Sequence, residues 1–275
     1  MRQLIPASGF YVAFFAISLG LLFLYSFWTQ VRYDVVPGFT LDNYLDSLGS
    51  PLIRAVVIRT IIVGFVTAAI TVPIAYVLAY VMRFVFTTKG RLLLDIVLIS
   101  MFSGYLVRIY AWRTILGKNG ILNAALLEIG VIDEPIRFLI FSNWAVMITL
   151  VGLLIPLSLL PIYSSMSNVS RDHLEVARDL GSRSWTLHRT ILLPMVLPGV
   201  SVAFAISFLL AAGDFVVPTM VGGTQGVMVG NLVNDWFKGV AQNWPLGSAL
   251  VFILLGLIVL ILAATNRVVR AVTRL

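Results

Sequence analysis

Ionisable residues are rare in the apolar runs of this sequence, so each one beside such a run is a candidate for chemistry. Asp214 follows the apolar stretch 202–212 after one glycine, and a carboxylate at that place could attract a cationic solute. Two simpler interpretations stay open: an interfacial carboxylate exposed to water, or one paired internally with Arg108.

A second group of polar and aromatic side chains closes another apolar run. Its members are Tyr105, Arg108, Tyr110 and Trp112. Tyrosine and tryptophan favour the membrane interface in general, so anchoring in an aromatic belt competes with a place on a solute pathway. Cation–π contact with an amine would be the functional use of these rings.

Other chemistries find little support. The 275 residues include no cysteine, which excludes disulfides, Cys-ligated zinc and a thiol nucleophile. Both histidines, His173 and His188, fall in one polar segment without further ligands at metal spacing, so we interpret them as loop-surface or partner-contact residues. We find no nucleophile–base set and no Gly-x-x-x-x-Gly-Lys-Ser/Thr phosphate loop. We therefore expect no catalytic residues, no bound metal or cofactor, and no enzymatic activity of the chain by itself.

The longest polar segment, residues 162–195, has the pattern helix, glycine turn, helix. Ser170 or Asp172 can cap a first helix, with Glu175 placed as in a capping box. Gly181 fits a left-handed helix stop, and Ser184 can cap a second helix that ends before the next span begins at Pro194. On physical grounds alone, the segment could be a solvated amphipathic connection between two spans.

Order and spacing add a resemblance. Glu175-Val176-Ala177, three residues, Gly181, nine residues, Ile191, one residue and Leu193-Pro194 is similar to the EAA loop of ATP-binding-cassette importer permeases. Val176 replaces the first alanine, a change that is conservative in size. Further segments resemble the spermidine/putrescine permeases of that family, namely residues 130–137, 213–218, 221–223, 229–232 and 243–249.

The resemblance implies a type I, methionine-importer-like permease fold in one transmembrane domain over 1–275, with 162–195 as its coupling loop. It implies a second, homologous permease subunit, two copies of a cytoplasmic ATPase that carry the ATP and magnesium, and an extracytoplasmic solute-binding protein. The ATPase-coupling residues would be Glu175, Ala177 and Gly181, with Asp172 and Arg178 beside them. Asp235 and Trp236 would help to form the gate or the surface for the binding protein.

Composition sets the class of element that must position these residues. Hydrophobic residues make up 60% of the chain and charged residues 11%, where a soluble domain has about a quarter charged. Six segments are long enough to cross a bilayer as helices, because unpaired backbone groups are not tolerated in lipid. They are 10–28, 55–82, 92–110, 138–161, 196–217 and 246–265. The sequence thus predicts an all-α, polytopic integral membrane protein of about six transmembrane helices.

Charge and short amphipathic segments complete the topology. Basic residues recur at 83–91, 171–189 and 267–274, so the positive-inside rule favours cytoplasmic termini in a bacterial inner membrane. The apolar run from Phe10 is longer than a signal-peptide core, and we expect it to be retained as a span. Residues 40–48 and 121–130 are expected to form short helices at the outer surface.

Three classes of function compete: an importer permease, an ion-coupled secondary transporter and an intramembrane enzyme. An ion-coupled secondary transporter would show inverted repeats or paired broken helices, and an intramembrane enzyme would need a convergent acid–base or metal set. Nucleic-acid binding would need a clustered basic footprint, whereas the net charge of +7 is dispersed between apolar spans. The resemblance of the polar loop to the EAA loop favours the importer permease, and the resemblance of the other segments to spermidine/putrescine permeases implies a polyamine or a related small solute.

Overall fold

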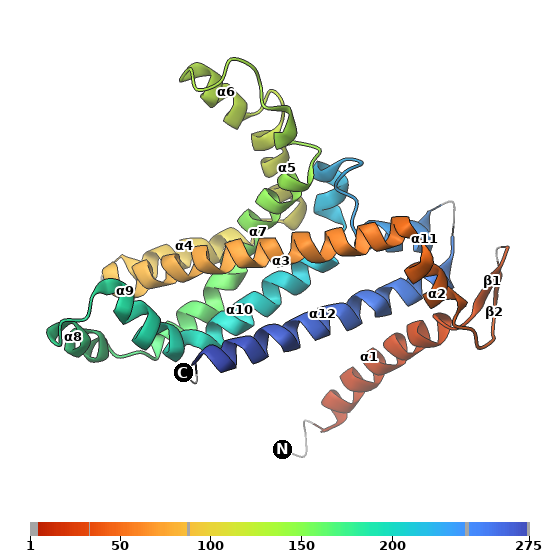
Figure 1. Cartoon of the computed structure of the whole chain (residues 1–275), viewed down its shortest axis with the longest axis horizontal. Coiled ribbons are helices and arrows are strands. Elements are labelled where there is room, and N and C mark those ends of the chain that lie inside the picture. The colour runs from red at the N-terminus through yellow and green to blue at the C-terminus, as the bar shows by residue number, and fades with distance from the viewer. Residues whose placement is uncertain (1–4, 33, 87–88, 240–241, 274–275) are drawn as a thin grey trace. The chain divides into compact units, whose positions relative to one another are not determined.

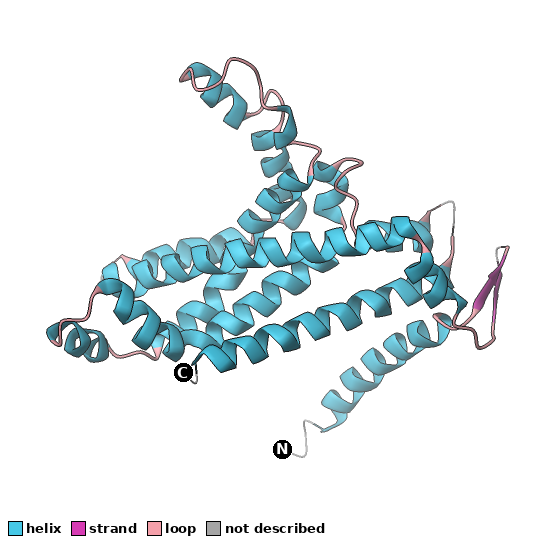
Figure 2. Cartoon of the chain, viewed as in Figure 1, coloured by secondary structure: helices cyan, strands magenta, loops and turns pink. Residues whose placement is uncertain are grey.

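Helices make up nearly all of the regular structure, which confirms the all-α prediction (Figure 2). The computed structural model describes residues 5–32, 34–86, 89–239 and 242–273, without the side chains of residues 5–8, 11, 171, 173, 178 and 268–273. Within the described chain, the sole sheet is a two-stranded antiparallel hairpin in which Gln30 pairs with Val35. The sequence analysis missed this hairpin, since its strands are only three residues long.

Contacts along the chain define two compact units. The first comprises the residues up to Thr60 and Met228–Ile261. It contains α1 (Ile5–Tyr25), β1 (Thr29–Val31), β2 (Asp34–Val36), α2 (Asp42–Gly49), the start of α3 (Pro51–Tyr80), α11 (Val229–Lys238) and most of α12 (Trp244–Thr273). The side-chain amide of Asn43 donates hydrogen bonds to the carbonyls of Ser26 and Trp28, at 2.9 and 2.8 Å, and so holds α2 against the end of α1.

The second unit comprises Ile61–Val227 and the C-terminal end from Leu262. After the rest of α3 it contains the π-helix η1 (Val81–Val85), α4 (Gly90–Met101), α5 (Tyr105–Leu116), α6 (Ile121–Glu128), the 3-10 helix η2 (Arg137–Leu139), α7 (Asn143–Ser167), α8 (Arg171–Asp179), α9 (Ser184–Thr186), the π-helix η3 (Leu187–Leu192), α10 (Leu193–Gly213) and the π-helix η4 (Pro218–Gly222). Helices α7 and α10 form its most extensive pair, joined by a 2.5 Å hydrogen bond between the buried hydroxyls of Ser158 and Ser207.

Four of the six predicted spans are confirmed as helices long and apolar enough to cross a bilayer within the described chain. They are Pro51–Val85, Asn143–Ser167, Ser184–Gly213 and Trp244–Arg267. The helix of the first predicted span, α1, ends at Tyr25 instead of residue 28. Its 21 residues form about 31 Å of helix, which is the thickness of the hydrocarbon core.

The predicted span 92–110 is wrong as a single straight helix. The chain leaves the helix after Met101, and a new helix starts at Tyr105 with a bend of 99° between the α4 and α5–α6 segments. Gly104 adopts an extended backbone conformation (φ −55°, ψ 140°), which ends the regular hydrogen-bond ladder there. Figure 1 shows α5 and α6 turning away from the direction of α4.

The fifth predicted span, 196–217, has different limits. Its helix continues without a break from Ser184 to Gly213, so Pro194 does not begin it. A proline removes a backbone donor and crowds the carbonyl four residues earlier, and the wider π-helical turn at Leu187–Leu192 accommodates this defect. Ser184 is the first helical residue and not the cap; Arg183 precedes it without a capping side-chain bond.

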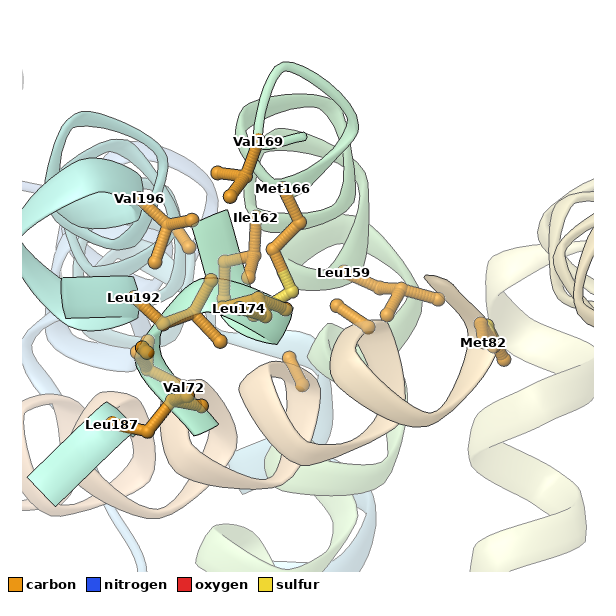
Figure 3. Close-up of a cluster of buried hydrophobic side chains, with 14 residues drawn as sticks. Val72, Met82, Leu159, Ile162, Met166, Val169, Leu174, Leu187, Leu192 and Val196 are labelled. Atoms are coloured by element: carbon orange, nitrogen blue, oxygen red, sulfur yellow. The ribbon is translucent and has the colours of Figure 1, made fainter. Parts of the chain in front are cut away.

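A continuous apolar core holds the polar loop to the spanning helices of the second unit (Figure 3). It combines residues of α3 and η1, α7, α8, η3 and α10. Its largest members include Met82, Leu159, Ile162, Met166, Leu174, Leu187, Leu192 and Val196. The loop therefore packs on the helices by burial of apolar area, although it is rich in charge.

Candidate functional site

Helix α8 is the central element of the polar loop, and its two ends are defined by local bonds. The Ser170 hydroxyl accepts a hydrogen bond from the backbone N–H of Asp172 at 3.2 Å, so Ser170, rather than Asp172, is the capping residue. At the other end Gly181 has φ +80°, the left-handed conformation that favours glycine. The N–H of Ser182 bonds to the carbonyl of Ala177 at 3.0 Å, which completes a Schellman turn and confirms the predicted helix stop.

One face of α8 is buried in the core of its own unit. Leu174 is 2% exposed and Ala177 4% exposed. The resemblance names Ala177 among the ATPase-coupling residues; in the structure this small side chain packs in the core of its own chain, where it lets α8 approach the ends of the spanning helices. The backbone of Arg178 belongs to α8, while its side chain lies outside the described residues.

The opposite face of α8 combines acidic and apolar side chains. Asp172, Glu175 and Asp179 are exposed, as are Val176 at 57% and Leu180 at 81%. Trp185 follows in α9 with 76% of its surface exposed. Large apolar side chains on an otherwise polar loop indicate a protein-binding surface.

A surface hollow lies along this part of the loop. Its volume is about 560 Å³, and its lining residues are Ser170, Asp172, Val176, Ala177, Leu180, Ser182 and Ile191. Among the exposed side chains here, sequence reasoning selected the acidic residues Asp172 and Glu175. It missed the apolar ones, Val176, Leu180 and Trp185. A signal was present: α8 has apolar residues on both faces, which is more than its anchoring on one core requires.

Of the two interpretations of His188, the loop-surface one is wrong. Its imidazole is half-buried, with Nδ1 3.0 Å from the hydroxyl of Tyr76 and with the ring centroid 4.5 Å from that of Tyr80. Both tyrosines belong to α3, so the histidine contacts a spanning helix of its own chain. The side chain of His173 lies outside the described residues.

Asp214 is placed at the start of the short helical segment that leads into η4. Its Oδ1 accepts hydrogen bonds from the N–H groups of Val216 and Val217, at 2.7 and 3.2 Å, which is the role of an N-cap. Its Oδ2 accepts a hydrogen bond from the hydroxyl of Tyr105. Among the described residues no ion pair joins Asp214 to Arg108, so the internal pairing considered from the sequence is not formed.

Tyr105, Arg108 and Asp214 nevertheless share one cavity. It has a volume of about 420 Å³, and most of its other lining side chains are leucines, namely Leu150, Leu153, Leu154, Leu157, Leu209 and Leu210. The Nε of Arg108 is buried and makes no hydrogen bond within the described chain. An apolar chamber with a carboxylate, a guanidinium and a phenol has the composition of a small-molecule site.

The remaining candidate residues are dispersed. Tyr110 is 55% exposed, whereas Trp112 is half-buried against α7. A Cβ on Gly152 of α7 would lie 2.2 Å from the indole ring, so Trp112 serves helix packing. Asp235 is exposed and Trp236 half-buried on α11, in the other compact unit.

Comparison with known sequences identifies relatives for most of the chain. Residues 47–274 match the family described as binding-protein-dependent transport system inner membrane component. The spermidine/putrescine permease protein PotB of Haemophilus influenzae is 35% identical over 179 residues, or 64% of this chain and 62% of that protein, just under two thirds of its length. PotB of Escherichia coli is 31% identical over 232 residues, 83% of each chain. The permease protein PotC of the same bacterium is 29% identical over 48% of this chain and 49% of its own.

Solved structures confirm the fold. A crystal structure of a bacterial ABC transporter that imports the acidic polysaccharide alginate contains a chain that superposes with a TM-score of 0.78. The match covers 99% of this chain and 95% of that one, at 16% sequence identity. Such low identity establishes the likeness of fold alone.

Proposed function

This chain belongs to the family of binding-protein-dependent transport system inner membrane components, and we propose that, as the permease subunit of such an importer, it moves a polyamine or a related small amine into the cytoplasm. The amine is proposed from its PotB relatives, whose names specify spermidine and putrescine. We place both termini in the cytoplasm, in line with the basic residues of 83–91, 171–189 and 267–274.

The observation that carries the coupling part of the proposal is the construction of α8. Its inner face is fixed to the core by Leu174 and Ala177, while its outer face presents Glu175, Val176 and Leu180 to a partner. When a docked protein moves, a helix anchored in this way can transmit the displacement to the spanning helices. We propose that the docked protein is a separate ATPase chain, present in two copies, that holds the ATP and magnesium.

The chemistry of the outer face suits such a partner. Leu180 and Val176 supply apolar area that docking would remove from water, and Glu175 supplies a charge for a basic residue on the ATPase. Gly181 turns the chain sharply after α8, so the docked helix and the helix that re-enters the membrane can differ in direction.

Two further partners complete the proposed importer. PotB and PotC are both named as permease proteins of a spermidine/putrescine transport system in Escherichia coli, which supports a second, homologous permease beside this chain. An extracytoplasmic binding protein would deliver the solute, and α11 with Asp235 and Trp236 is our candidate for its contact surface.

The leucine-lined cavity is our candidate for part of the solute path. Its apolar walls match the methylene segments of an alkyl amine, and Asp214 is the group that would meet an ammonium. The Tyr105 hydroxyl donates one hydrogen bond to Oδ2 of Asp214, and the second lone pair of this oxygen remains as the acceptor for an ammonium N–H.

Reconstitution with the proposed partners tests the function. The chain, its co-expressed permease and ATPase partners, and the binding protein are placed in vesicles, and uptake of labelled spermidine is measured with and without ATP. ATP-dependent uptake is the expected result. Stimulation of ATP hydrolysis by the binding protein without uptake of any amine would refute the substrate, and failure of the chain to bind an ATPase would refute the coupling assignment.

A matched pair of glycine variants ties the result to α8. Gly181 and Gly130 both have a left-handed backbone, at φ +80° and +69°, and at neither position would an added Cβ meet another atom within 4 Å. Gly181→Arg should abolish uptake while the protein still inserts, because it distorts the turn after the docking helix. Gly130→Arg carries the same backbone strain outside this loop and should retain uptake. Equal losses in both variants would contradict the assignment.

A further inference from the structure

A contact between α3 and the helix that follows α8 joins two segments more than a hundred residues apart in sequence. The Tyr76 hydroxyl and His188 Nδ1 are 3.0 Å apart. The imidazole packs edge-on against both tyrosines of this helix, with ring centroids 5.9 Å from Tyr76 and 4.5 Å from Tyr80. Tyr76 and Tyr80 are one helical turn apart, so together they form a cradle for the ring.

The backbone at His188 has a form that directs this side chain. The carbonyl of His188 accepts the N–H of Leu193, five residues on, which is the hydrogen bond of a π-helical turn. One extra residue in the turn rotates the preceding segment about the helix axis relative to α10. Leu187, next to the histidine, is buried in the same core as Leu174 of α8. The position of α8 and the position of the imidazole are thus linked through packed side chains.

On the other side of the contact, α3 has a weak point close to Tyr76. Pro73 lies inside the helix, three residues before Tyr76. A proline in this position removes one hydrogen bond of the helix and lowers its resistance to bending. The part of α3 after Pro73 can therefore move together with the loop at a lower bending free energy than an uninterrupted helix would require.

Apolar packing alone would couple these elements loosely. Burial of apolar area has no preferred direction, so Leu174 and Ala177 resist separation of α8 from the core more than they resist rotation or sliding. A hydrogen bond depends on distance and angle. The Tyr76–His188 bond is the kind of contact that passes on a rotation.

We propose that Tyr76 and His188 are positioning residues for energy coupling: their hydrogen bond passes the movement of α8 to the segment of α3 beyond Pro73. This inference rests on the proposed function, in which an ATPase docks on α8, and it deepens that function by naming the route into the membrane. Neither residue contacts the solute or the ATPase in this assignment.

The test compares uptake per ATP hydrolysed in reconstituted complexes. Tyr76→Phe removes the hydroxyl and keeps the ring; the expected result is a roughly two- to tenfold fall in spermidine taken up per ATP, the range of one net hydrogen bond. ATPase binding should not change. Tyr163→Phe is the matched control, because Tyr163 packs against the same core and its hydroxyl makes no hydrogen bond to a described residue.

Variants of the histidine separate the hydrogen bond from packing. His188→Leu should lower the spermidine taken up per ATP hydrolysed at least as much as Tyr76→Phe does. His188→Asn retains a hydrogen-bonding atom near the Nδ1 position, so its uptake per ATP should lie between those of His188→Leu and the wild type. The double variant Tyr76→Phe/His188→Leu should be no worse than His188→Leu alone, since both changes remove one interaction. Additive losses, or equal ratios for Tyr76→Phe and Tyr163→Phe, would overturn the inference.

A second measurement keeps the inference distinguishable from the proposed function. If the wild type takes up no amine with ATP, the proposed substrate fails. Hydrogen exchange of residues 77–85 on addition of the ATPase then decides the inference. A change in the exchange rate of these residues that occurs in the wild type and is lost in Tyr76→Phe supports the coupling role of the hydrogen bond. The same change in both proteins, or no change in the wild type, overturns it.

Discussion

Replacing Leu174 by alanine should release α8 from the core while leaving its partner-facing side unchanged. Leu174 is 2% exposed and packs in the cluster that also holds Met166 and Leu187. Leu180, six residues later on the same helix-turn segment, is 81% exposed. The same substitution at these two positions removes the same atoms from a buried site and from an exposed one.

The expected size of the effect follows from the atoms removed. Leucine to alanine deletes three carbons, each contributing about 0.8 kcal/mol when fully buried, or about 2.4 kcal/mol in total. This is near the lower end of the roughly 2–5 kcal/mol measured for buried leucines, as expected for a surface helix that can settle into the space. Such a change multiplies the open population of α8 by about 60-fold.

Hydrogen exchange of the α8 amides measures that population directly, since local opening exposes them to solvent. Leu174→Ala should accelerate exchange in this helix by about the 60-fold given by its loss of burial. Leu180→Ala should leave exchange nearly unchanged and instead weaken ATPase binding, because its side chain is available to a partner.

The reasoning would be refuted by equal exchange rates in the two variants, which would mean that burial of Leu174 does not hold α8. It would also be refuted if Leu174→Ala weakened ATPase binding without changing exchange. That result would make the buried face, and not the exposed one, the docking surface.

Three further predictions concern single positions. Gly181→Ala should raise the free energy of the left-handed turn by about 1 kcal/mol and lower the thermal midpoint of the purified protein, while Gly256→Ala, in a helix with open space around it, should not. Gly152→Ala forces a Cβ into the ring of Trp112 and should destabilise by roughly 1–3 kcal/mol; combining it with Trp112→Ala should make its further cost close to zero in the same melting assay. Asp214→Asn keeps an oxygen for the N-cap and loses the charge, so it should retain most of the stability but raise the KM for amine uptake; an unchanged KM would remove Asp214 from the solute path.

The spanning helices were predictable because their signal is local. Each of α3, α7, α10 and α12 contains a run of apolar residues that only a helix can satisfy in lipid, whatever its neighbours are. The break after Met101 was not predictable in this way, since apolar residues continue on both sides of it and hydropathy does not report backbone direction. The continuous helix through Pro194 failed for a related reason: proline favours a helix start, but a π-helical turn tolerates it.

The polar loop 162–195 also has features that the local sequence predicts and features that depend on tertiary packing. The cap Ser170, the stop Gly181 and their spacing belong to the sequence itself, because caps and left-handed turns depend on residues only a few positions away. The predicted capping box is wrong, since Glu175 would complete it only with Asp172 as the cap. Which face of α8 is buried, and hence that Ala177 lies in the core while Leu180 is exposed, depended on packing against helices far along the chain. The same is true of His188, whose partner Tyr76 lies 112 residues earlier. Local chemistry thus determined that this chain carries a loop helix with a defined start and stop, and only the tertiary structure decided which side chains hold it and which remain exposed, since burial is a property of contacts that no short stretch of sequence contains.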